Sequence, residues 1–135
     1  MRWIVIMLVI VGLLFTACTP SDEKLLAELE DAYYDVANVI INDEFAVVDL
    51  KPYMASDPQA QAWLQEALDD PEGRSGARQP WFNEQGEILV VTMGTIELDR
   101  SDCPEQVCGD VSFSTSNGDF TLEFAREGGD WLLMG

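Results

Sequence analysis

The stretch "VSFSTSNGDFTLEFAREGGDWLLM", residues 111–134, decides the fold class of this chain of 135 residues. Apolar and polar residues alternate on both sides of Asn117-Gly118, which is the pattern of half-buried strands. Asn-Gly is the strongest short hairpin signal, and "EGGD" at 127–130 predicts a second turn. The stretch therefore predicts an antiparallel meander that closes with residues 131–134.

A further strand is expected before this meander. Residues 87–98, "EILVVTMGTIEL", are rich in Val, Ile and Thr. Both of their faces are apolar at the start, so we expect that end to be covered on both sides. Gly94 indicates a bulge or a bend. The sheet would then have three or four strands.

Helical patterns occupy the region before the strands. Residues 24–41 carry apolar side chains at helical spacing, with Tyr33 on the apolar side and Tyr34 away from it. A short helix is expected within 44–54, stopped before Pro52. Helices followed by an antiparallel meander indicate an α+β fold, with N-terminal helices packed on a curved sheet.

Another helix is expected after residue 57, because Ser56 or Asp57 can cap it and Pro58 suits its first turn. Its predicted apolar stripe consists of Ala60, Trp63, Leu64, Ala67 and Leu68. The glycines and prolines of "DPEGRSGARQP", residues 70–80, predict a loop that holds Arg74 and Arg78.

Residues 1–17 are typical of a secretory signal peptide. Arg2 is the only charge before the apolar run 3–17, which is shorter than the about 20 residues of a membrane span. The residues Phe15-Thr16-Ala17 before Cys18 resemble the lipobox of bacterial lipoproteins. The alternatives are an ordinary signal peptide followed by a chance cysteine, and an uncleaved N-terminal anchor.

The lipobox resemblance implies cleavage between Ala17 and Cys18 and a diacylglyceryl group, such as palmitate chains, on the Cys18 thiol. Long acyl chains would hold the protein on the membrane of a bacterial cell envelope. Thr19 after the cysteine resembles the outer-membrane case. Residues 18–23 would then be a lipidated tether, and residues 24–135 a single α+β domain.

The chain is strongly acidic, with 25 Asp and Glu against 7 Lys and Arg and a formal net charge of −18. Loss of Arg2 with the signal peptide would lower this charge from −18 to −19. Such a surface excludes nucleic acid and anionic lipid headgroups as partners. A cationic protein partner, bound multivalent cations and a merely solvated surface, as in an organism from salty water, all remain open.

If Cys18 carries lipid, Cys103 and Cys108 remain as a pair in "CPEQVC". An exported protein meets an oxidising compartment, so we expect a structural disulfide between them. The spacing is not that of a CxxC redox motif. The chain has no histidine, which removes the commonest general base and histidine metal sites.

We therefore expect no catalytic residue, no cofactor and no metal site. Calcium is the weighed alternative, because Asp99, Asp102 and Glu105 cluster in "LDRSDCPEQ". This cluster lacks the glycine and the oxygen spacing of an EF-hand loop, and Arg100 lies within it.

Two stretches, "AYYDVANVIINDEFAVVDLKPYM" at 32–54 and "FAREGGDWLLMG" at 124–135, resemble the nuclear-transport-factor-two-like fold, also called the cystatin-like roll. This resemblance implies a long helix across the concave face of the sheet. Such a roll can leave a hollow, here lined by Tyr33, Phe45, Tyr53, Trp63 and Trp81, with Phe82 beside them. The alternative is that these aromatic side chains simply belong to the core. Some members are ketosteroid-isomerase-like enzymes, for which Tyr33 and Asp57 would be the candidates. A core position for Tyr33 and a helix cap for Asp57 explain both residues without catalysis.

The sequence thus favours an envelope lipoprotein that acts as a non-catalytic binding or accessory module. An acidic inhibitor or immunity protein against a cationic envelope hydrolase is the first alternative, because opposite charge speeds association. A carrier of a small apolar ligand, or a roll-type isomerase, is the second.

Overall fold

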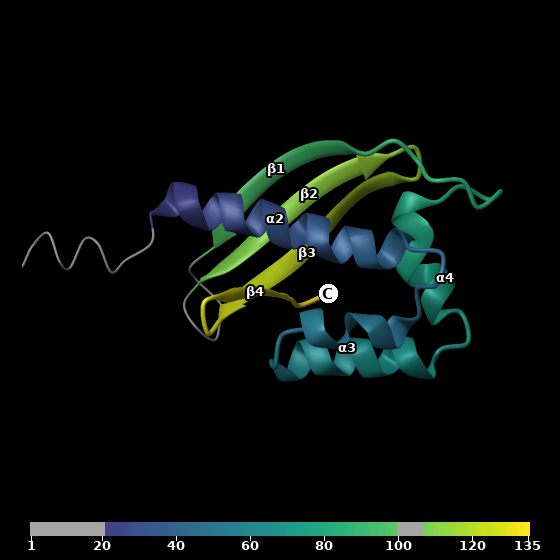
Figure 1. The fold of residues 1–135 in the computed structure, drawn as a ribbon, viewed down its shortest axis with the longest axis horizontal. Helices are drawn as coiled ribbons and strands as arrows, with labels where there is room; N and C mark the ends of the chain where they lie inside the picture. The colour runs from purple at the N-terminus through teal and green to yellow at the C-terminus, as the bar shows by residue number, and fades with distance from the viewer. Residues whose placement is uncertain (1–20, 100–106) are drawn as a thin grey trace, which may run out of the picture.

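The computed structural model describes residues 21–99 and 107–135. This part of the chain has an α+β fold, as predicted, with the helices before a four-stranded sheet (Figure 1). The helical elements are α2 (Asp22–Ile41), the 3-10 helix η1 (Val47–Tyr53), α3 (Pro58–Asp69), α4 (Gly73–Arg78) and the 3-10 helix η2 (Gln79–Trp81). The strands are β1 (Thr92–Asp99), β2 (Cys108–Thr115), β3 (Gly118–Glu127) and β4 (Asp130–Leu133).

The sheet is an antiparallel meander in the order β1-β2-β3-β4. The hairpin between β2 and β3 is confirmed, but its turn lies one residue earlier than the sequence suggests. Thr115 pairs with Gly118, so Ser116 and Asn117 form the two-residue turn. Gly118, with a φ of 132°, already belongs to β3.

Glycines shape two other points of the sheet. Gly128 and Gly129 form the predicted second turn with φ values of 58° and 89°, a region that glycine enters without steric cost. The register of β1 against β2 shifts between Met93 and Ile96, which confirms the irregularity expected at Gly94. A Cβ atom on Gly94 would lie 3.1 Å from the Ser112 carbonyl oxygen.

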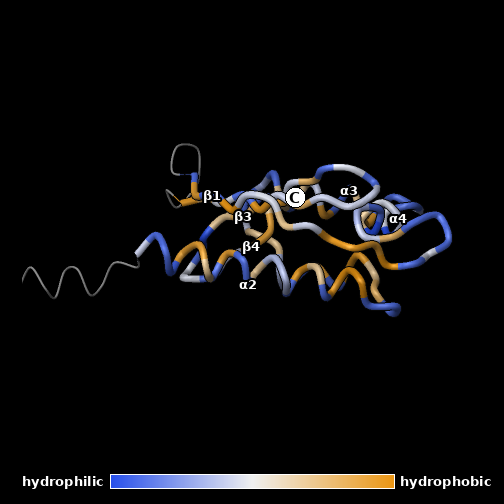
Figure 2. The backbone as a smooth tube through the Cα atoms, turned by 90° about the horizontal axis from the view of Figure 1, so that it is seen from above, coloured by the Kyte–Doolittle hydropathy of each residue, from blue (hydrophilic) through white to orange (hydrophobic). Residues whose placement is uncertain are grey.

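Helix α2 lies across one face of the sheet, as the ribbon and the view from above show (Figures 1 and 2). Its buried residues are Leu25, Leu29, Tyr33, Val36, Ala37 and Ile40. Tyr34 is 44% exposed, in keeping with its predicted place off the apolar side. Gly109 in β2 allows the close approach, because a Cβ atom there would overlap the Leu29 side chain.

Helix α3 lies beyond β4 in Figure 1, and α4 lies next to the C-terminal end of α2. The Ala55 N–H donates to the Leu133 carbonyl oxygen at 2.9 Å, which ties this helical part to the β4 edge. The N–H and hydroxyl of Ser56 both donate to the carboxylate of Glu127, at 2.8 Å for the N–H. These bonds cover part of an edge that would otherwise expose its backbone.

The loop predicted for residues 70–80 is wrong, since α4 occupies residues 73–78. Gly73 is buried at the start of α4, and a Cβ atom there would overlap the Ala67 carbonyl group. This glycine therefore serves close helix packing rather than a turn. The predicted stripe of α3 is wrong at Leu68, which is 40% exposed, whereas Ala60 and Leu64 are buried.

The predicted strand 87–98 is shorter than expected. Ile88 and Val90 are 61% and 86% exposed, so the expectation that this end is covered on both sides is wrong. The segment pairs elsewhere, because the Leu89 N–H donates to the Trp81 carbonyl oxygen at 2.8 Å. Its apolar residues thus form an extended arm before β1 instead of a covered strand.

The prediction that the short helix stops before Pro52 is wrong, because η1 contains this proline. A proline removes only one N–H donor from so short a helix. The Met54 N–H then bonds the Lys51 carbonyl oxygen at 3.4 Å and closes the last turn.

Candidate functional site

Three carboxylates form a row across the face of the sheet that points away from α2. Glu97 of β1 lies opposite Asp110 of β2, and Asp110 lies opposite Glu123 of β3. Their position follows from strand alternation, because the neighbouring Gly109 meets Leu29 of α2 on the other face. We call Glu97, Asp110 and Glu123 the carboxylate row.

The row is an electrostatically unfavourable arrangement. Like charges directly opposite each other on neighbouring strands destabilise a sheet. Partial burial raises the pKa of Asp110, and the nearby charges of Asp99 and Glu97 raise it further. Among the described residues, 21–99 and 107–135, no Lys or Arg forms an ion pair with a member of the row.

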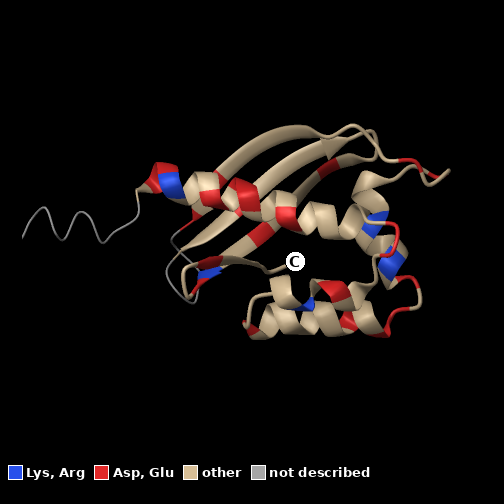
Figure 3. Cartoon of the chain, in the orientation of Figure 1, with Lys and Arg blue, Asp and Glu red and all other residues tan. Residues whose placement is uncertain are grey.

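The acidic surface extends beyond the row. Glu66 of α3 lines the same shallow pocket as Glu123, so the acidic surface continues from the sheet onto α3. Asp and Glu also follow the exposed side of α2, while Lys and Arg are few (Figure 3). Arg126 and Lys24 both pair with Glu28, at 2.9 and 3.9 Å, away from the row. The hydrogen bond and charge of Arg126 lower the pKa of Glu28.

Two other arginines neutralise no carboxylate of the row. Arg78 donates from Nε to the Ile40 carbonyl oxygen at 3.1 Å and from Nη2 to that of Ile41 at 3.4 Å. Arg74 donates to the carbonyl oxygens of Phe45 at 2.6 Å and Asp43 at 2.9 Å. Helix α2 has no basic residue in its last turn. Arg78 therefore satisfies two carbonyl groups of the last turn of α2, and Arg74 satisfies two of the segment that follows the helix.

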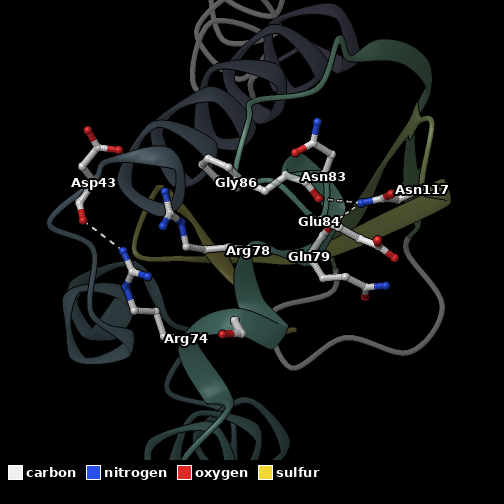
Figure 4. A pocket seen from close by; sticks show the side chains of 10 residues that line it. Asp43, Arg74, Arg78, Gln79, Asn83, Glu84, Gly86 and Asn117 are labelled. Carbon is white, nitrogen blue, oxygen red and sulfur yellow. Dashed lines mark hydrogen bonds between the residues drawn. The ribbon is translucent and has the colours of Figure 1, made fainter.

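These arginines form one side of a pocket of about 540 Å³. In Figure 4, the guanidinium groups of Arg74 and Arg78 lie near Asp43, while Gln79, Glu84 and Asn117 lie across the pocket. The remaining lining residues are Ser75, Phe82, Asn83 and Gly86.

The walls of the pocket are held in place by tertiary contacts. Arg78 Cζ lies 3.9 Å from the centre of the Phe82 ring. The Asn117 amide donates to the carbonyl oxygens of Gln79 at 2.6 Å and Phe82 at 2.8 Å, which ties the β2–β3 turn to η2. The geometry offers guanidinium donors on one side and carboxylate and amide groups on the other.

Sequence reasoning missed this pocket because it assigned both arginines to a loop. One signal was available, namely two of the few cations of an acidic chain spaced four residues apart, which places them on one side of a helix.

The aromatic residues predicted to line a cavity are not gathered around one hollow. Tyr33 and Trp81 are buried in the core, where Trp81 Nε1 donates to the Tyr33 hydroxyl at 3.4 Å. Trp81 also stacks on Phe113, with 5.1 Å between ring centroids. Phe45 is also buried in the core, and together with Tyr53 it contributes to a surface pocket next to η1. Trp63 lies beside Gly135.

The two residues of the isomerase alternative have structural partners. Asp57 caps α3, because its Oδ2 accepts the Gln59 N–H at 2.9 Å, as predicted. Burial raises the pKa of Tyr33, and the hydrogen bond from Trp81 partly opposes that rise. The structure accounts for both side chains through a helix cap and the core.

Several predicted residues lie outside the described part of the chain. They are Ala17, Cys18, Arg100, Asp102, Cys103 and Glu105. Of the two cysteines of the expected disulfide, only Cys108, the first residue of β2, is described. The disulfide and the calcium alternative therefore both stay predictions. Within residues 21–99 and 107–135, no group of three or more Cys, Asp or Glu side chains is placed to hold a metal ion. None of the helices in these ranges has the length and hydropathy of a membrane span.

No family model matches the chain, and neither a curated protein nor a solved structure matches it. The lipobox and the roll-like fold family therefore stay predictions from the sequence.

Proposed function

We propose that this protein is a lipid-anchored binding module of the bacterial envelope, whose acidic sheet face binds a cationic protein. The observation that carries the proposal is the carboxylate row. Its two opposed pairs, Glu97 with Asp110 and Asp110 with Glu123, oppose folding of the sheet. A partner that brings Lys or Arg to this face would relieve that repulsion.

The chemistry of such an interface is favourable for fast and selective association. Opposite potentials steer the encounter, and like-charged competitors are repelled. The three carboxylates occupy directly paired positions on neighbouring strands, so they keep fixed spacings that a rigid basic surface can match. Glu66 on α3 extends the same acidic surface.

The experiment is a capture assay with the tagged full chain in detergent and a panel of purified basic hydrolases, such as lysozyme-like enzymes. It is run at about 0.05 and 0.3 M salt, which span weak and strong screening. We expect one basic protein to be retained at both salt concentrations. Capture of every basic protein at low salt, and of none at high salt, would show that the acidity is only a solvated surface.

A matched pair of variants locates the interface. One variant neutralises the row with Glu97→Gln, Asp110→Asn and Glu123→Gln. The control removes three charges from the exposed side of α2 with Glu30→Gln, Asp31→Asn and Asp35→Asn. We expect the first variant to lose the partner and the control to keep it.

An inhibitor of a cationic hydrolase is the special case in which the captured protein is an enzyme and its active site is covered. Activity of the captured enzyme distinguishes the two, since an inhibitor abolishes turnover and an accessory module leaves it intact.

The anchor is tested separately. Cys18→Ser removes the proposed lipid attachment, and long acyl chains account for most of the membrane affinity. We expect the variant to leave the membrane fraction or to keep its signal peptide. A processed variant that stays membrane-bound would contradict the lipid anchor.

A further inference from the structure

The pocket beside α4 has donors that the fold does not use. A guanidinium group has five N–H donors. Arg74 and Arg78 each place two of them on carbonyl oxygens around the end of α2. Three donors on each side chain therefore remain at a pocket of about 540 Å³.

The guanidinium groups of Arg74 and Arg78 lie at one pocket and repel each other. Burial lowers the pKa of Arg78, the charge of Arg74 lowers it further, and Asp43 partly opposes both effects. Capping the end of α2 does not require two full charges, since neutral donors satisfy helix carbonyls as well. A bound anion would offset the remaining repulsion and use the free donors.

The lining of the pocket selects among anions. Asp43 and Glu84 carry negative charge at its wall, and the whole chain has a formal charge of −18. Both features disfavour a dianion such as phosphate. A single carboxylate suits a guanidinium fork, and an N–H group near it would find acceptors in the side chains of Glu84 and Gln79.

We propose that this pocket binds the carboxylate of an amino acid or of a peptide end, with Arg74 and Arg78 on the carboxylate and Glu84 on a neighbouring N–H group. The pocket volume lies within the range of about 300–1,000 Å³ typical of small-ligand sites. A ligand of one or two residues fits this chemistry. The site is separate from the carboxylate row and does not depend on it.

The test is a chemical-shift titration of the isotope-labelled full chain in detergent micelles. The probes are alanine, dialanine, N-acetylalanine amide and inorganic phosphate. We expect alanine or dialanine to shift the Nε signals of Arg74 and Arg78 in a saturable way. N-acetylalanine amide, which lacks a carboxylate, should cause no shift. The affinity for phosphate should be lower than that for the carboxylates by a factor of about ten or more. Tighter binding of dialanine would identify a peptide end, and tighter binding of alanine a free amino acid.

Two variants separate binding from structure. Ser75→Phe fills the pocket from the exposed side of α4 and leaves both arginine caps in place, so it should abolish the shifts. Arg126→Gln removes an arginine outside the pocket and should bind as the wild type does. The proposal is overturned by equal binding in Ser75→Phe, by phosphate binding as tightly as the carboxylates, or by no saturable shift up to about 50 mM probe, far above a millimolar dissociation constant.

Discussion

The carboxylate row predicts that removing its central charge stabilises the protein. Asp110 faces Glu97 on one neighbouring strand and Glu123 on the other. Asp110→Asn keeps the shape of the side chain and removes both repulsions at once. We expect the free energy of unfolding to rise.

The size of this gain follows from the two opposed pairs. A like-charged cross-strand pair costs about 0.2–1 kcal/mol, and the exposure of Glu97 and Glu123 places each pair in the middle of that range or below. Together they amount to about 0.4–1.2 kcal/mol. In a domain of this size, that corresponds to about 2–6 °C in the melting temperature.

The assay is urea and thermal unfolding near pH 7 in low and high salt. Asp35→Asn is the control, because it removes one charge from the exposed side of α2, where no strand faces it. We expect the control to change stability by less than about 0.5 kcal/mol. The gain from Asp110→Asn should shrink in high salt because screening weakens the repulsion.

The pH dependence has a definite sign. Since folding raises the pKa of Asp110, its ionised form destabilises the folded state at neutral pH. The difference between wild type and Asp110→Asn should therefore shrink as the pH falls through the raised pKa. It should vanish below about pH 3.9, the ordinary value of an aspartate. Equal effects of both variants, or a gain that salt and acid leave unchanged, would refute the reasoning.

Three further predictions concern packing, the α2 end and the cysteines. Gly109→Ala should lower the free energy of unfolding by about 1–3 kcal/mol in urea, because its Cβ atom would overlap Leu29. Its control, Gly76→Ala in α4, meets no atom within 4 Å and should stabilise by about 0.5–1 kcal/mol. Arg78→Ala should cost about 1–3 kcal/mol in the same assay, because the Ile40 and Ile41 carbonyls lose their side-chain donors. Mass spectrometry after alkylation should find no free thiol in the exported lipidated chain before reduction and two after it; one free thiol in unreduced protein would contradict the Cys103–Cys108 disulfide.

Local patterns in the sequence predicted the elements whose signals come from neighbouring residues. The apolar spacing of residues 24–41 predicted α2 and the inward position of Tyr33. Alternation and turn glycines predicted the meander, and Gly94 marked the register shift in β1. Each of these follows from side-chain periodicity or from the backbone freedom of one residue.

Features that depend on distant contacts could not be predicted in this way. Gly73 suggested a loop, but its missing side chain instead lets α4 pack against the Ala67 carbonyl. Ile88 and Val90 have the side chains of a buried strand, yet they lie in an exposed arm because the neighbouring Leu89 bonds to Trp81. The arginine pocket depends on the end of α2 meeting α4, more than thirty residues later in the chain.

The association rate of the captured basic protein tests the central claim most directly. It is measured against salt for the wild type, the row variant and the α2 variant, which differ only in where three charges are removed. The account predicts that the row variant loses most of the rate and of its salt dependence, while the α2 variant stays close to the wild type. Equal losses in both variants would show that net charge alone drives binding, and would contradict a specific role for the carboxylate row.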